Sequence, residues 1–193
     1  MSKIKIITTP DPRLREPSKK VTEITPTVKN IIKKMVEASL DWEKIHEHEL
    51  SAAMAAPQLG ENVRIIIIRD DLDDKENNHF TALINPEILS TSGRIEKDYE
   101  GCLSVPYYYG LVPRPKNAKI RALLEDGTPV KIKAEGVMAR TLLHEIDHLN
   151  GVLFIDHIRN NKRAWKKMND KGDLEPVDYD TEIKDNKDLF PDD

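Results

Sequence analysis

Two histidines one helical turn apart carry the clearest chemical signal in the sequence. They belong to His144-Glu145-Ile146-Asp147-His148, an H-E-x-x-H pattern in a segment of helical periodicity. On a helix, residues four apart lie about 40° from each other on one face, so both imidazoles can bind the same ion. Glu145 is rotated by about 100° from His144, which lets it reach a water on that ion without being a ligand. The pattern therefore predicts a metal site with a general base beside it.

A catalytic site of this kind usually has three protein ligands and one open position. A downstream histidine is one candidate for the third ligand. The metzincin pattern H-E-x-x-H-x-x-G-x-x-H is met at Gly151, but Phe154 stands where that pattern requires the third histidine. The next histidine along the chain is His157. The metzincin arrangement is therefore excluded.

Cys102 is the single cysteine of the chain, so no intrachain disulfide can form. Such a cysteine is a buried small apolar residue, a nucleophile or a metal ligand, and composition does not choose among these roles. It lies in Glu100-Gly101-Cys102-Leu103-Ser104-Val105-Pro106, where Gly101 permits close approach of another group and Pro106 ends a strand. A loop cysteine flanked in this way can direct its thiolate at an ion held by a helix.

A third segment, Ser51-Ala52-Ala53-Met54-Ala55-Ala56-Pro57-Gln58-Leu59-Gly60, is rich in small residues. Small residues allow another part of the chain to approach closely, and Gln58 adds an amide donor. Taken alone, this segment is more typical of tight packing without chemistry.

Two helices are expected to position these segments. Thr25-Pro26 is typical of a helix start, and apolar residues at helical spacing predict a helix over residues 26–46. A second helix is expected from about 136 to 150, and Gly151 then occupies the position of a glycine that ends a helix. The H-E-x-x-H motif lies on this second helix, which has a separate apolar face.

Several short stretches predict strands. Residues 63–68 form a β-branched run, residues 82–86 predict another strand, and residues 119–124 and 130–134 flank the turn sequence Asp126-Gly127. The expected fold class is α+β, with short, mostly antiparallel strands packed around a central helix that carries the H-E-x-x-H motif.

Charge divides the chain into two expected parts. Residues 170–193 contain ten acidic and three basic residues, which predicts an acidic, mobile C-terminal tail. Residues 1–169 are then expected to form one domain, which contains the predicted metal site. Just before the tail, Arg159–Lys167 holds five basic residues and no acidic one, and a solvated helix face is the ordinary interpretation of such a run.

Composition also excludes several classes of protein. A net charge of −4 argues against a dedicated nucleic-acid binder, so no DNA partner is expected. Apolar runs stay well below 18 residues, so no membrane-spanning helix is expected. Met1–Ile6 does not resemble the start of a secretory signal. With one cysteine and no disulfide, the expected compartment is the reducing cytoplasm.

Taken together and in this order, the three segments resemble the peptide deformylase family. That family carries G-x-G-x-A-A-x-Q, E-G-C-x-S and H-E-x-D-H segments. Here they correspond to Ala55-Ala56-Pro57-Gln58, Glu100-Gly101-Cys102-Leu103-Ser104 and the helical histidine motif. Pro10-Asp11-Pro12-Arg13-Leu14-Arg15 is similar to the family's N-terminal P-D-x-x-L-R. The resemblance covers roughly residues 4–165.

The resemblance implies a metal-dependent hydrolase that removes the N-formyl group from the N-terminal methionine of newly synthesised proteins and releases formate. The implied ligands of one divalent ion are Cys102, His144 and His148. Fe(II) is the ion implied by the family, and Zn, Ni or Co are also able to occupy such a site. Glu145 is implied as the residue that accepts and returns the proton.

The resemblance also implies donors and peptide contacts. The Gln58 side-chain amide and the Leu103 backbone N–H are the implied donors to the formyl oxygen, and Ala53 and Gly101 are expected at the bound peptide. The sequence departs from the family at two positions, because Ser51 and Ala53 replace the two glycines of the first segment. The added Cβ of Ala53 is expected to narrow the cleft or to resist a positive φ.

N-formylmethionyl nascent peptides are the implied partners. The basic run Arg159–Lys167 adds the hypothesis that the protein contacts ribosomal RNA through its phosphates. Two alternatives stay open. One is a related metal-dependent amidase or peptidase with a different acyl-peptide substrate, which the altered Ser51/Ala53 loop permits. The other is a catalytically impaired homologue that acts as a binding protein, against which the presence of Glu145 counts.

Overall fold

One antiparallel sheet organises the molecule. The computed structural model describes residues 4–46, 49–72, 74 and 76–191. The strands in this part of the chain form a seven-stranded sheet of order β1-β2-β3-β4-β6-β7, with β5 also paired to β4. Their bounds are Ala53–Ala55 (β1), Ile65–Arg69 (β2), Phe80–Cys102 (β3), Val105–Leu123 (β4), Pro129–Glu135 (β5), Trp165–Met168 (β6) and Leu174–Pro176 (β7).

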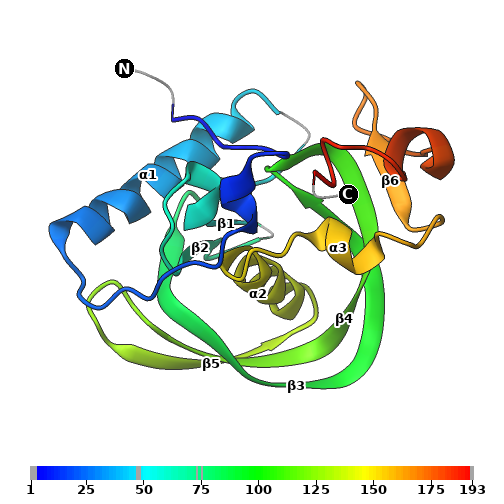
Figure 1. Cartoon of the computed structure of the whole chain (residues 1–193). Coiled ribbons are helices and arrows are strands. Elements are labelled where there is room, and N and C mark those ends of the chain that lie inside the picture. The colour runs from blue at the N-terminus through cyan, green and yellow to red at the C-terminus, as the bar shows by residue number, and fades with distance from the viewer. Residues whose placement is uncertain (1–3, 47–48, 73, 75, 192–193) are drawn as a thin grey trace.

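Helix α2, Gly136–Leu149, lies at the centre of the fold. In Figure 1 the strands β3, β4 and β5 pass around it. Its apolar face, which includes Leu142 and Ile146, packs in one buried cluster with Ile66 of β2 and Ile120 of β4. The expected α+β class, with a central helix that carries the histidine motif, is confirmed.

Helix α1, Pro26–Glu43, covers the other side of β2. The Thr25 hydroxyl accepts a hydrogen bond from the Val28 N–H at 3.4 Å, which caps the helix as predicted. The helix ends at Glu43, three residues before the predicted end. The Glu43 carboxylate pairs with Arg69 and accepts a hydrogen bond from the Ser51 N–H. Within the described residues, no helix is long and apolar enough to cross a membrane.

Strands β3 and β4 form a hairpin much longer than the expected strand over residues 82–86. Their register shifts at four places, and the first lies between Ile84 and Glu87, around Asn85 with φ 52°. Such bulges bend a strand. Most of β3 after this point is exposed, so its sequence lacks the apolar alternation that would have predicted a strand. At its end β3 delivers Cys102.

Three further short helical segments lie along the chain. The 3-10 turns η1, Pro12–Arg15, and η2, Ala56–Leu59, lie before the sheet's centre in sequence, and α3, Phe154–Ile158, follows α2. The predicted hairpin between β4 and β5 is confirmed, with Gly127 at φ 88° in its turn. Gly151 follows α2 with φ 74°, as expected of a glycine that ends a helix.

The basic run Arg159–Lys167 is not a helix face, so this interpretation was wrong. The chain turns after α3 and forms strand β6, because Trp165 is buried against Phe190 from near the C-terminus. The expected start of the acidic tail, residue 170, lies in the turn between β6 and β7. The one-turn helix η3, Tyr179–Ile183, follows, and Phe190 is buried. The mobility of this segment stays a prediction.

Gly151→Ala is expected to lower the free energy of unfolding by about 3 kcal/mol. The new Cβ would lie 2.3 Å from the Arg15 carbonyl oxygen, and the positive φ adds strain. Urea denaturation measures this loss. Gly127→Ala is the matched control, because it has a similar φ of 88° but its nearest contact is Ile24 at 3.9 Å. Equal losses in the two variants would contradict a role for the contact with Arg15.

Candidate metal centre and cleft

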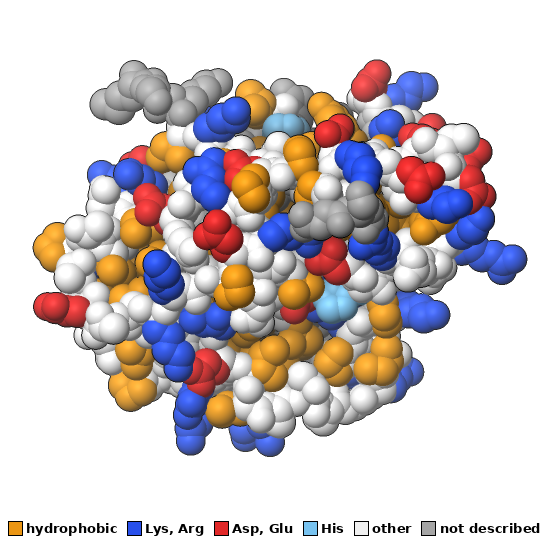
Figure 2. Space-filling view, in the orientation of Figure 1, with side chains coloured by type: hydrophobic (Ala, Val, Ile, Leu, Met, Phe, Trp, Pro, Cys, Tyr) orange, Lys and Arg blue, Asp and Glu red, His pale blue; other side chains and the backbone are white. Residues whose placement is uncertain are grey.

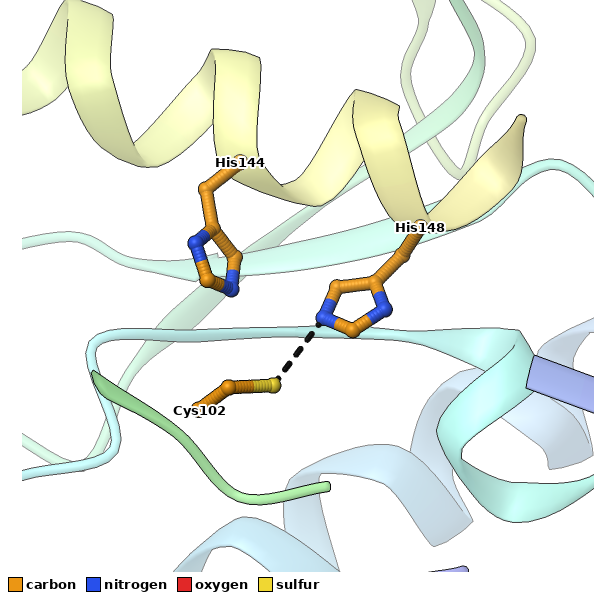
Figure 3. Close-up of side chains that lie close together, drawn as sticks. All are labelled: Cys102, His144 and His148. Carbon is orange, nitrogen blue, oxygen red and sulfur yellow. Dashed lines mark hydrogen bonds between the residues drawn. The ribbon is translucent and has the colours of Figure 1, made fainter. Parts of the chain in front are cut away.

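Three predicted ligands converge from two elements. Cys102 comes from the end of β3, and His144 and His148 come from one face of α2 (Figure 3). One donor atom from each residue lies within 4.8 Å of the others. The Cys102 Sγ is 3.2 Å from the His148 Nε2. The structure thus holds a metal-binding group made of the residues that the sequence predicted from separate segments.

The electrostatics of this group suit a divalent ion. Burial raises the pKa of Cys102, but the imidazoles of His148 and His144 outweigh this effect and lower the pKa to about 5. The sulfur is therefore a thiolate at neutral pH, which is the form that binds metals. The Nδ1 of His144 lies 2.9 Å from a Glu100 carboxylate oxygen, so its Nε2 is left for an ion. One thiolate and two imidazoles fit first-row divalent ions.

Glu100 has a role that its place in the sequence did not indicate, because its partners Arg114, Arg140 and His144 lie on other elements. Arg114 donates to both carboxylate oxygens at 2.9 Å, and Arg140 donates to one at 2.7 Å. Burial raises the pKa of Glu100, but the hydrogen bonds with His144 and Arg114 outweigh it and hold the pKa well below its usual range. Glu100 is therefore an ionised carboxylate that orients the His144 ring.

Asp147, between the two histidines in sequence, extends this network away from the ligands. It accepts a hydrogen bond from Arg114 at 2.5 Å and lies 2.7 Å from the Nε2 of His157. His157 is therefore a partner of Asp147 and not a member of the ligand group. Nothing in the sequence around Arg114 indicated this role, since its partners are on other elements.

Glu145 has the surroundings of a general base. Its side chain is 5% exposed and borders the same cleft as Cys102. Within the described part of the chain, its buried Oε2 has no hydrogen-bond partner. Burial raises the pKa of Glu145 above its usual value, although the two imidazoles oppose this effect. A carboxylate with a free oxygen and a raised pKa binds a proton more readily than an ordinary glutamate does, which suits a general base.

The two predicted donors also border the cleft. Gln58, held in η2, accepts from the Ala55 N–H at 2.8 Å and donates to the Ser104 hydroxyl at 3.2 Å. The same amide nitrogen lies 3.7 Å from the Cys102 Sγ. Leu103 lies in the turn that joins β3 to β4. Both residues therefore lie beside Cys102.

The cleft has a volume of about 470 Å³, and Ala53 and Gly101 line it as expected. Ala53 lies in strand β1, opposite Ile68, and its φ is not positive, so the added Cβ causes no backbone strain. A Cβ on Gly101 would lie 2.5 Å from the Tyr109 ring, which explains the glycine beside Cys102. The expected strain at Ala53 is thus absent.

Comparison with known proteins agrees with this geometry. Residues 3–164 match the family described as polypeptide deformylase. A peptide deformylase of Rhodopseudomonas palustris is 43% identical over 162 residues, covering 82% of this chain and 87% of the relative. Another, from a Synechococcus species, is 36% identical over 178 residues and covers 90% and 84%.

Solved structures give the same result. A peptide deformylase of Synechococcus elongatus, in complex with actinonin, superposes with a TM-score of 0.72 at 35% identity and covers 82% of each chain. The Legionella pneumophila peptide deformylase gives a TM-score of 0.70 at 36% identity, covering 79% of this chain and 84% of the other. With the matched motifs in place around the Cys-His-His group, the chain belongs to the peptide deformylase family.

Proposed function

We propose that this protein removes the formyl group from N-formylmethionyl nascent peptides, with Cys102, His144 and His148 as ligands of its metal ion. The observation that carries this proposal is the buried, unpartnered oxygen of Glu145 beside the Cys-His-His group. A purely structural metal site has no need of such a base.

The residues of the cleft divide the work of hydrolysis. A divalent ion bound to the Cys-His-His group supplies Lewis-acid activation of a water molecule. Glu145 accepts the proton at Oε2 as water adds to the formyl carbon, and it returns a proton to the peptide nitrogen when the C–N bond breaks. The Gln58 amide and the Leu103 N–H donate to the formyl oxygen, where negative charge develops. The products are formate and a free amino terminus.

Fe(II) is the ion that we propose for the native enzyme. A thiolate with two imidazoles binds several first-row ions, so the supply of metal in the cell decides between them. The low pKa of Cys102, about 5, makes the thiolate open to oxidation. A reducing cytoplasm, where nascent chains are made, is the compartment that fits both the single cysteine and this substrate.

The basic run Arg159–Lys167 supports a weaker part of the proposal, contact with ribosomal RNA. Lys162 already pairs with Asp180 at 2.7 Å, and Lys167 pairs with Glu182 at 3.4 Å. Figure 2 shows basic and acidic side chains interspersed over the end of the molecule that holds β6 and η3. Phosphates would have to replace these carboxylates, so we expect weak and salt-sensitive binding.

Protein loaded with Fe(II) without oxygen is expected to release formate from formyl-Met-Ala-Ser, and Glu145→Gln is expected to lower kcat by about 10²–10⁴-fold. Formate release and metal content are measured together, with Glu125→Gln in an exposed turn as the control. No formate from the metal-loaded protein would overturn the proposed function. Turnover of acetyl-Met-Ala-Ser instead would favour the amidase alternative, and full activity of Glu145→Gln would remove that residue from the reaction.

Cys102→Ala is expected to abolish stoichiometric metal binding, because two histidines alone leave the site one protein ligand short. Elemental analysis after dialysis against metal-free buffer measures the number of metal ions bound per chain. His79→Ala, an exposed histidine outside the ligand group, is expected to keep one ion per chain. Full occupancy in Cys102→Ala would show that the sulfur is not a ligand.

Co-sedimentation with ribosomes tests the RNA contact. Binding is expected at low salt and to decrease in the double variant Lys162→Ala/Arg163→Ala, since each lost cation removes a phosphate contact. Equal, salt-insensitive sedimentation of both proteins would rule out this contact.

A further inference from the structure

We propose that strand β6 completes the peptide-binding cleft, and that Met168 and Tyr109 form a subsite for apolar side chains of the residues that follow the formyl-methionine. This inference rests on the proposed function, because it names the part of the substrate that lies beyond the reacting group. The family match ends at residue 164, so Met168 comes from a segment that the match does not include.

Pairing with β4 brings β6 to the cleft. Lys167 lies opposite Tyr108, Lys166 opposite Tyr109 and Trp165 opposite Gly110. Met168 then lines the same cavity as Cys102 and Glu145. Its sulfur lies 3.9 Å from the Tyr109 hydroxyl. The subsite is therefore continuous with the metal centre.

The alternation of a strand explains which side chains face the cleft. Successive residues of a strand point to opposite faces. Trp165 and Lys167 both contact the Tyr108 ring. The Trp165 and Tyr108 ring centroids are 6.4 Å apart, and the Lys167 Nζ lies 5.5 Å from the centroid of the Tyr108 ring. Lys166 lies over Tyr99, a residue of the cleft wall, at 5.3 Å. Met168 lies two residues after Lys166 on the same face of β6, so its side chain also points toward the cleft.

The C-terminal segment holds β6 in place. Trp165 is 3% exposed and meets the Phe190 ring edge-on at 6.2 Å. Ile183 and Leu189 are buried in the same cluster. A subsite built on a strand that is anchored by its own core keeps its shape without a bound peptide.

Tyr109 is fixed as the second wall of the subsite. Its ring lies against Gly101, beside the ligand cysteine, and its hydroxyl donates to the Glu49 carboxylate. Burial raises the pKa of Tyr109, and the Glu49 charge raises it further. The phenol is therefore a neutral donor with its partner already supplied, and the ring face is what remains for a ligand.

The chemistry of these walls selects an apolar occupant. An aromatic ring and a flexible thioether pack well against aliphatic and aromatic side chains. The neighbouring polar groups already have partners: Tyr109 binds Glu49, and the Lys166 amine lies 3.4 Å from the Leu174 carbonyl oxygen. An apolar side chain can therefore enter without displacing these hydrogen bonds, and it gains contacts with the ring and the thioether that the small, polar side chain of serine does not make.

Formate release from formyl-Met-Leu-Leu and formyl-Met-Ser-Ser tests this proposal. The ratio of kcat/KM for the two peptides is expected to fall about fivefold in Met168→Ala, mostly through KM, because part of the apolar contact is lost. Met168→Leu keeps an apolar side chain of similar volume and is expected to restore the ratio. Met168→Gln keeps the length but adds a polar end, and it is expected to lower the ratio as Met168→Ala does.

Lys167→Ala is the matched control, because this neighbour faces the other side of β6. The wild-type ratio is expected in this variant, and circular dichroism checks that each variant is folded. An unchanged ratio in folded, active Met168→Ala and Met168→Gln would overturn the subsite while leaving the deformylase activity standing. Failure of the wild-type protein to release formate from either peptide would instead overturn the proposed function.

Discussion

The geometry of the metal-binding group depends on the ion pairs and hydrogen bonds of one buried carboxylate, that of Glu100. An isolated charge inside a protein is very costly, and it persists only with partners of opposite charge or with hydrogen-bond donors. Here the partners are Arg114 from β4 and Arg140 and His144 from α2. Because Glu100 itself lies near the end of β3, a single carboxylate joins three elements.

This arrangement couples the fold to the ligand geometry. Cys102 follows Glu100 by two residues on β3, so the contact that fixes Glu100 to α2 also sets the distance between the sulfur and the two imidazoles. Arg114 reaches on to Asp147, one residue before His148. Each helical histidine therefore lies beside a residue held by the same arginine. Removing one member would leave other buried charges uncompensated, which is the costly case for such networks.

Residue spacing within short segments of the sequence predicted those elements whose structure depends mainly on neighbouring residues. The central helix with its two histidines, its terminal glycine and the Asp-Gly hairpin follow from spacing within short segments, whereas the addition of Cys102 to the metal-binding group rested on the resemblance to the family. The length of β3 was not predictable in this way, because its exposed middle has no apolar alternation. Strand β6 was mistaken for a helix face because its anchor, Trp165, packs on Phe190, which lies 25 residues later. The partners of Glu100 are missed for the same reason, since Arg114 and Arg140 are brought to it only by the fold.

A buried ion pair also fixes the loop before β1, which forms part of the cleft wall. Ser51 stands where the resemblance expects glycine, and both its backbone groups are held. Its N–H donates to Glu43 at 2.7 Å, and its carbonyl oxygen accepts from the fully buried Arg69 at 3.4 Å. Glu43 and Arg69 pair with each other at 2.5 Å, so the loop is fixed by an ion pair that links α1 to β2. A wall fixed in this way does not have to be ordered when the peptide binds, so less conformational entropy is lost in forming the complex.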